Sequence, residues 1–202
     1  MKLFTKPDAW TGGSYEFALE YCPPSDEALR LALAAIWRDP TVTGCYVHAD
    51  KEPGDQEVVP PSTLAARRDA IDGRWLGIAI LPNGCRVPCS SCIVREEDGS
   101  DWLYFGAAMG CLSYCYPVGA FPLDDGGDLS WRPELDRWLR GIAARVYATV
   151  PFRLGLVGWI IGGDVCAADL AARGVPQERW EGYLWPESGG LGWYPANQGA
   201  PM

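Results

Sequence analysis

The chain has 202 residues, of which 48% are hydrophobic and 21% are charged. This composition excludes an intrinsically disordered chain, which would be poor in apolar residues. Acidic residues outnumber basic ones by 26 to 17 and give a net charge of −9. An acidic surface repels phosphate backbones and anionic lipids, so we expect neither nucleic acid nor a membrane as a partner.

The length predicts a single globular domain over residues 1–202, with an irregular, aromatic, Gly- and Pro-rich segment from about residue 176 to 202. The first ten residues, MKLFTKPDAW, contain no apolar core of a secretion signal. The longest apolar stretch, residues 154–163, is shorter than the ~20 residues of a membrane span. We therefore expect a cytoplasmic protein, and the scarcity of Lys beside abundant Ala and Gly suggests a bacterial one. The eight cysteines are then expected as reduced thiols.

The first half of the chain shows the patterns of strands and helices in turn. Residues 14–22 alternate, which predicts a half-buried strand with one apolar face formed by Tyr15, Phe17, Leu19 and Tyr21. Ser25 is the expected N-cap of the helix that follows, and Ser62 that of a second, short helix. In chain order we expect a strand over 14–22, a helix over 26–38, a strand over 41–47, a short helix over 62–73 and a strand over 74–81.

A β-hairpin is expected in the middle of the chain, over about residues 88–108. Two runs rich in strand-forming residues flank Asp98 and Gly99, and Asp-Gly is a strong signal for a two-residue hairpin turn. With that turn, Cys92 lies opposite Phe105 in the neighbouring strand.

The second half of the chain adds two helices and one buried strand. The clearest helical pattern begins at Pro133, a residue that suits the first turn of a helix. We expect helices over 133–149 and 164–173, with a strand over 152–161 between them. Because helices and strands mix without regular β-α-β alternation, we predict an α+β fold with a largely antiparallel sheet packed by two or three helices.

The cysteines raise the main chemical question of the sequence. Cys85, Cys89 and Cys92 have the C-x3-C-x2-C spacing that radical-SAM enzymes use for a [4Fe–4S] cluster. Those enzymes build a large barrel around the cluster, whereas only about half of this chain follows Cys92, so the context of the motif does not fit. A zinc site is the second interpretation, with two cysteine pairs as ligands: Cys89 with Cys92, and Cys111 with Cys115.

The alternative for these cysteines is a role as hydrophobic side chains of the sheet. Cys89 and Cys92 point to opposite faces in a regular strand, because side chains alternate with a period of two. They could share a metal only where the strand breaks between them, and Pro88 is a candidate for such a break. We therefore favour buried or edge thiols and expect no cofactor, with zinc as the alternative.

No other catalytic motif stands out in the sequence. The one histidine, His48, lies in a polar loop, and its closeness to Cys45 in sequence is no evidence for a Cys–His pair. No phosphate-binding loop and no nucleophile elbow occurs. Acidic residues gather before Pro133, and we interpret them as a turn whose charges favour the helix N-terminus rather than as a cation site.

Aromatic residues crowd the last quarter of the chain, and aromatic side chains are the anchors that protein interfaces favour. With the acidic charge, they predict a non-enzymatic protein-binding domain, for example an immunity or antitoxin-like protein that neutralises a basic partner. A small zinc- or iron–sulfur-dependent enzyme and a carbohydrate-binding module are the alternatives. The candidate partner-binding residues are Trp180, Tyr183, Trp185, Trp193, Tyr194, Asp124, Asp125 and Asp128.

Overall fold

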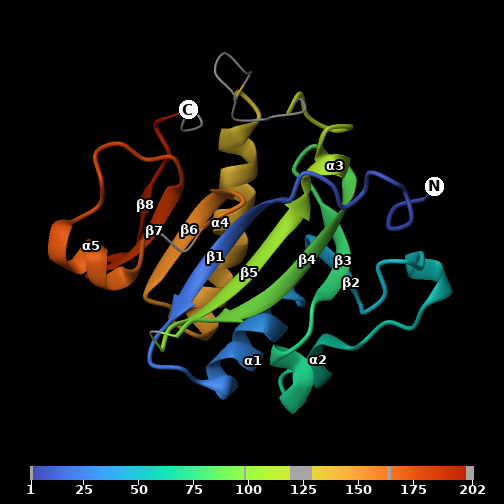
Figure 1. The fold of residues 1–202 in the computed structure, drawn as a ribbon, viewed down its shortest axis with the longest axis horizontal. Helices are drawn as coiled ribbons and strands as arrows, with labels where there is room; N and C mark the ends of the chain where they lie inside the picture. The colour runs from blue at the N-terminus through green and yellow to red at the C-terminus, as the bar shows by residue number, and fades with distance from the viewer. Residues whose placement is uncertain (1, 98, 119–128, 163–164, 199–202) are drawn as a thin grey trace.

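Strand β1 (Ser14–Tyr21) lies inside an eight-stranded sheet in which neighbouring strands are antiparallel. The structure is a computed structural model and describes residues 2–97, 99–118, 129–162 and 165–198. The strand order across the sheet is β2-β3-β4-β5-β1-β6-β7-β8 (Figure 1). This architecture confirms the predicted α+β fold. The other strands are β2 (Val42–Tyr46), β3 (Trp75–Ile80), β4 (Arg86–Arg95), β5 (Asp101–Ala108), β6 (Leu154–Trp159), β7 (Gly182–Glu187) and β8 (Gly190–Tyr194).

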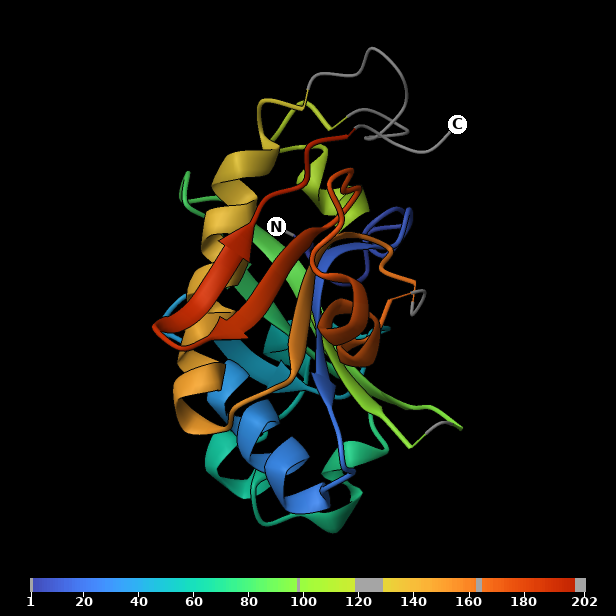
Figure 2. The same ribbon diagram turned by 90° about the vertical axis from the view of Figure 1, so that its left-hand side faces the viewer.

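Helices cover both faces of the sheet (Figure 2). The long helix α4 (Arg132–Thr149) and helix α1 (Asp26–Ile36) lie side by side on one face, and the short helix α5 (Ala167–Arg173) lies on the other. They correspond to the three helices predicted from the sequence, although residue 164 of the third lies outside the described residues. The connections hold α2 (Pro61–Leu64), α3 (Met109–Leu112) and two 3-10 turns, Pro53–Asp55 and Arg68–Ile71.

The alternation along β1 places its large apolar side chains against α1 and α4. These side chains are fully or almost fully buried in the main hydrophobic cluster: Tyr15, Phe17, Leu19 and Tyr21. Ser25 caps α1 as predicted, because its Oγ accepts a hydrogen bond from the N–H of Ala28 (3.2 Å).

The opposite face of β1 is also covered, whereas the sequence predicted a half-buried strand. The carboxylate of Glu16 accepts a hydrogen bond from the N–H of Ile161 (3.2 Å), and that of Glu20 accepts one from the N–H of Ala167 (2.6 Å). Two acidic side chains that would suit a solvated face therefore bind backbone donors of the segment that leads into α5. Beside them, a second hydrophobic cluster packs α5 on β5, β1, β6 and β7.

The N-terminal segment covers the β2–β3 end of this same face. Phe4 is buried there in a small cluster with three strand residues, Tyr46, Leu76 and Ile78. The segment has no regular secondary structure.

The register of the β4–β5 hairpin differs by one residue from the prediction. Cys92 lies opposite Tyr104 and not opposite Phe105. Opposite residues of an antiparallel pair share a face, so Cys92 and Tyr104 lie on the α5 side of the sheet. Phe105 packs toward α1 and α4.

The turn explains the shift. The N–H of Glu96 donates to the carbonyl oxygen of Ser100 (2.9 Å), so three residues rather than two form the turn. Gly99 closes it with φ +84°, a left-handed conformation that glycine adopts without strain. Asp98, the other predicted turn residue, lies outside the described residues.

The C-terminal segment forms the hairpin of β7 and β8, where the sequence predicted an irregular tail. Gly182 of β7 lies under the indole of Trp193 in β8, since a Cβ at this glycine would come within 2.0 Å of the ring. Glycine here makes room for an aromatic ring inside a strand. A high glycine content alone cannot distinguish such a strand from an irregular segment.

The predicted helix over 62–73 is also wrong in extent. The chain forms only the single turn of α2 and the 3-10 turn Arg68–Ile71. Pro60 and not Ser62 occupies the N-cap position of α2, and it makes no side-chain cap. A proline before the helix cannot supply the oxygen that caps it.

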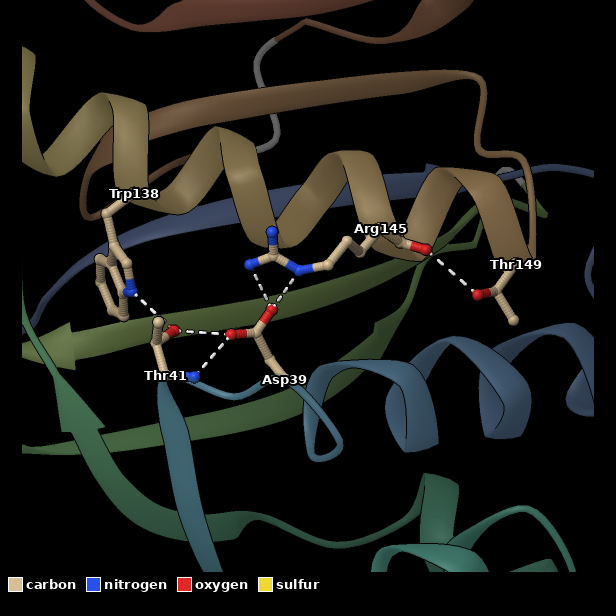
Figure 3. A network of polar contacts seen from close by, with 5 residues as sticks. All are labelled: Asp39, Thr41, Trp138, Arg145 and Thr149. Carbon is tan, nitrogen blue, oxygen red and sulfur yellow. Dashed lines mark hydrogen bonds and ion pairs between the residues drawn. The ribbon is translucent and has the colours of Figure 1, made fainter.

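A buried carboxylate joins α4 to the connection between α1 and β2 (Figure 3). The side chain of Asp39 is 1% exposed, and its Oδ1 accepts hydrogen bonds from the N–H (2.9 Å) and Oγ1 (2.6 Å) of Thr41. Its Oδ2 accepts from Nε of Arg145 on α4 (2.5 Å). Oγ1 of Thr41 accepts in turn from Nε1 of Trp138 (2.9 Å), so two turns of α4 are fixed to the start of β2.

We predict that Arg145→Ala lowers the free energy of unfolding by about 3 kcal/mol, because it leaves the buried carboxylate of Asp39 without a counter-charge. The matched control is Arg67→Ala, whose partner Asp69 is 65% exposed at a similar distance (2.6 Å). That change should cost less than about 1 kcal/mol. Urea unfolding at pH 7 measures both, and equal costs would contradict the role given to burial.

Candidate functional site

The four cysteines predicted as a zinc set lie in separate places. Cys89 is fully buried on the α1 and α4 face of β4, where burial raises the pKa of its thiol, and Cys92 lies on the opposite face. Pro88 keeps its place in the regular pairing of β4, so the strand does not break there. Cys111 and Cys115 lie in and after α3. In the described ranges, no group of three or more His, Cys, Asp or Glu side chains is placed to hold a metal ion.

Cys111 and Cys115 share a cavity with Cys85, which the zinc interpretation left out. The cavity has a volume of about 500 Å³, and three cations also line it: Lys2, Lys6 and Arg86. Cys111 is buried, whereas Cys85 and Cys115 are half-buried. Nothing in the sequence links position 85 to position 115, because the two meet only through the fold.

A second cavity, of about 440 Å³, lies between the N-terminal half of α4 and the C-terminal segment. The guanidinium of Arg140 lies 4.8 Å from the ring centroid of Trp193 at this cavity, a cation–π contact. Arg132, Asp136 and Arg137 also line it. The sequence contains no motif that pointed to this place.

A buried network under the second cavity fastens the C-terminal segment. The hydroxyl of Tyr15 donates to Oδ1 of Asp136 (2.5 Å) and accepts from Nε of Arg132 (3.0 Å). The guanidinium of Arg132 also donates to the carbonyl oxygens of Trp180 and Gln198. Burial raises the pKa of Asp136, while its bond with Tyr15 and the charge of Arg132 oppose that shift. Arg132 and Asp136 are buried, and both form hydrogen bonds with the hydroxyl of Tyr15. We therefore interpret them as structural residues.

The five aromatic residues predicted as partner contacts do not form one surface. Tyr183 is 3% exposed and belongs to the cluster below α5. Trp185 and Tyr194 are half-buried against that cluster, whereas Trp193 packs on the opposite face of the sheet. Trp180 is half-buried and binds Arg132 through its carbonyl oxygen. The three predicted acidic contacts lie outside the described residues: Asp124, Asp125 and Asp128.

The loop after β2, residues 47–59, exposes two aliphatic side chains. Val47 is 48% exposed and Val58 is 52% exposed. The N–H of Val59 donates to the carbonyl oxygen of Cys45 (2.8 Å), so the two ends of the loop run side by side. The two valines therefore lie on neighbouring segments. The sequence predicts only a polar loop around His48 and does not reveal the two exposed valines.

Side chains hold the loop in one conformation. The amide of Gln56 accepts from the N–H of His48 (3.0 Å) and donates to the carbonyl oxygens of His48 (2.8 Å) and Lys51 (2.9 Å). His48 thus contributes its backbone to the loop. A hollow of about 500 Å³ opens beside Val47, and its lining includes the acids Asp55 and Glu57 and the cations Lys51 and Arg67.

Glu52 ties the same loop to the N-terminal segment. Its carboxylate accepts hydrogen bonds from the N–H groups of Leu3 (2.8 Å) and Thr5 (2.8 Å) and from Oγ1 of Thr5 (2.7 Å). Burial disfavours its charge, but these hydrogen bonds outweigh burial and lower the pKa of Glu52 to about 2. The carboxylate is therefore ionised across the physiological range and keeps its backbone partners.

The pKa of Glu16 is shifted in the opposite direction from that of Glu52. Burial raises its pKa to about 7, against the hydrogen bond from Ile161 and the charge of Arg74. Cys92 and Tyr104 on the neighbouring strands face the same region and interact electrostatically with Glu16. A carboxyl group that titrates near neutrality is suited to proton transfer. Here it also holds the segment before α5, which accounts for its burial.

Comparison with protein-family models, with curated proteins and with solved structures finds no match to this chain. Among the helices that the structure describes, none combines the length and the apolar character needed to cross a membrane.

We predict that Glu16 makes the protein less stable as the pH rises from about 4.5 to 7. Below this range the carboxyl is protonated in both states, and within it the unfolded chain ionises while the folded one stays protonated. The loss is on the order of 3 kcal/mol, complete above pH 7.

Glu16→Gln should abolish this part of the pH dependence, since Gln stays neutral and can still accept from Ile161. The variant should match the wild type at pH 4.5 and exceed its unfolding free energy at pH 8. Glu97→Gln, at an exposed position, is the control. Denaturant unfolding across this pH range measures the effect, and parallel curves for wild type and Glu16→Gln would refute it.

We also predict that Tyr15→Phe destabilises the fold by about 2–3 kcal/mol, because Asp136 and Arg132 each lose a buried hydrogen-bond partner. Tyr21→Phe is the matched control on the same strand and face. Its buried hydroxyl has no hydrogen-bond partner among the described residues, so its removal should cost nothing. Thermal and urea unfolding compare the two, and similar losses would argue against the network.

Proposed function

We propose that this protein is a cytoplasmic protein-binding domain whose contact surface is the loop of residues 47–59, and that its partner is a basic protein. An immunity or antitoxin-like role in a bacterium is the concrete form of this proposal. The observation that carries it is the pair of exposed valines on a loop that side chains hold in place.

Exposed apolar side chains on an ordered loop support a role in recognition. Val47 and Val58 expose about half of their surface, and burial of such side chains by a partner is favourable. A loop that is already fixed loses little conformational entropy on binding. Gln56 and Glu52 provide this order from inside the loop.

Charge supports a basic partner. The chain carries a net charge of −9, and the loop adds Asp50, Asp55 and Glu57 around the valines. The hollow beside Val47 is lined by two acids, Asp55 and Glu57, and by two cations, Lys51 and Arg67, so the case for a basic partner depends on the net charge of the whole chain. Complementary charge accelerates association and disfavours acidic competitors. The proposed contact surface is thus not the set of C-terminal aromatic residues predicted from the sequence, which are divided between two faces of the sheet.

The test compares two double variants with the wild type. Val47→Ser/Val58→Ser removes the proposed anchors, and Leu31→Ser/Val94→Ser removes two other exposed aliphatic side chains of 38% and 39% exposure. Each immobilised protein is exposed to a lysate of its source organism at low salt and washed at rising salt. Thermal unfolding first confirms that all three proteins are folded.

We expect wild type and the Leu31/Val94 variant to retain the same basic protein, which high salt releases because the attraction is screened. The Val47/Val58 variant should retain at least about tenfold less, the equivalent of about 1.4 kcal/mol. Retention that is equal on both variants would place the contact elsewhere. Absence of any basic protein from the retained fraction would refute the charge argument.

A further inference from the structure

We propose that Cys85 and Cys115 form a redox-active pair that closes into a disulfide by exchange with a small anionic disulfide of the glutathione type. This site is separate from the loop of residues 47–59 and does not depend on its function. It assigns a covalent modification to two of the eight cysteines.

One side chain holds the two cysteines in place. Oδ1 of Asn83 accepts a hydrogen bond from the N–H of Cys85 (3.0 Å), and Nδ2 of Asn83 donates to the carbonyl oxygen of Cys115 (3.3 Å). Gly84, with φ +83°, completes the turn that carries Cys85. The turn between β3 and β4 is therefore bound to the segment after α3 at the position of the two thiols, which line the same cavity.

The pair is accessible to a small molecule. Both thiols are half-buried and line the open cavity of about 500 Å³, whereas the third thiol there, Cys111, is 6% exposed. Elsewhere in the sheet Cys45 and Cys89 have no exposed surface, whereas Cys92 is half-buried, as are Cys22 and Cys166 outside this cavity. Access therefore selects Cys85 and Cys115 at this cavity.

The lining of the cavity favours an anionic reagent. Lys2, Lys6 and Arg86 are the charged residues around it, and all three are cations in a chain whose net charge is −9. Cations around a concave site raise the local concentration of anions. Glutathione disulfide carries several carboxylates and matches this charge.

The two thiols have different roles in the exchange. Burial and the neighbouring thiols of Cys85 and Cys111 raise the pKa of Cys115 to about 12, so Cys115 stays protonated near neutral pH. The thiolate is the attacking species in such exchanges. The first attack therefore falls to Cys85, and Cys115 resolves the mixed disulfide.

The reaction balances in two steps. The Cys85 thiolate attacks one sulfur of glutathione disulfide, a bond forms between Cys85 and that sulfur, and one glutathione thiolate leaves and takes up a proton. Cys115 then gives up its proton and attacks the sulfur of Cys85, which releases the second glutathione. Two protein thiols are oxidised to one disulfide, and one glutathione disulfide is reduced to two thiols.

The test uses the full chain, reduced and then exposed to glutathione disulfide at neutral pH. Free thiols are blocked with an alkylating reagent, and mass spectrometry of unreduced peptides identifies the linked cysteines. We expect a Cys85–Cys115 cross-link in the wild type and in Cys111→Ser. Cys115→Ser should stop at glutathione attached to Cys85, and Cys85→Ser should give no cross-link.

A charge variant tests the cationic cavity. Lys2→Gln/Lys6→Gln should react several-fold more slowly with glutathione disulfide but at the wild-type rate with hydroxyethyl disulfide, which is uncharged. Near-ultraviolet circular dichroism of the reduced variants shows whether they are folded. A cross-link between any other pair, or no cross-link in folded wild-type protein, would overturn the proposal. Equal slowing with both reagents would refute the role of charge.

Discussion

Two carboxylates on one face of β1 hold the layer of the molecule that carries α5. Glu16 and Glu20 accept hydrogen bonds from backbone donors at Ile161 and Ala167. On its other face the same strand supplies Tyr15 and Phe17 to the core beneath α1 and α4. Each layer is thus bound to one strand, by polar contacts on one side and by apolar packing on the other. Burial of charged groups on a strand is costly unless each finds a donor, and the segment before α5 supplies those donors.

Charged side chains elsewhere in the protein are also paired with groups close to them in the fold. The chain is acidic overall, yet the cavity at Cys85 has no acid in its lining and the cavity at Arg140 has only Asp136. Arg132 binds the C-terminal segment, and Arg140 stacks on Trp193. Acidic side chains in turn bind backbone N–H groups, as Glu52 does with Thr5. Net charge alone therefore does not predict the charge that lines these two cavities.

Periodicity in the sequence was enough to predict most elements of the fold. The alternation of β1 and the cap at Ser25 are local features, and the structure has them where the sequence places them. The hairpin of β4 and β5 was predicted, but its register depends on the hydrogen bond between Glu96 and Ser100. The amino-acid sequence of the turn is equally compatible with a two-residue turn, which gives a different register. The hairpin of β7 and β8 was missed because Gly182 lies under Trp193, a contact that no local pattern reveals.

The candidate sites were less predictable than the fold. Exposure of Val58 depends on how the loop closes on itself, which requires the bond between Val59 and Cys45. The meeting of Cys85 with Cys115 requires the β3–β4 turn to lie against the segment after α3. Motif spacing drew attention to Cys89 and Cys92, which the strand separates onto opposite faces. Chemistry that arises from distant segments has no signature in the spacing of nearby residues.

The position of β1 in the sheet has a consequence for how the chain folds. This strand is synthesised early, but its neighbours in the sheet come much later: Ser14 pairs with Ala108, and Tyr15 pairs with Trp159. Both edges of β1 stay without their native partners until most of the chain has left the ribosome. Closing such long loops before the pairing compensates for them makes folding slow. During that interval a strand with one apolar face and two open edges is exposed to other chains, so the unfinished chain is more prone to aggregation than the finished fold.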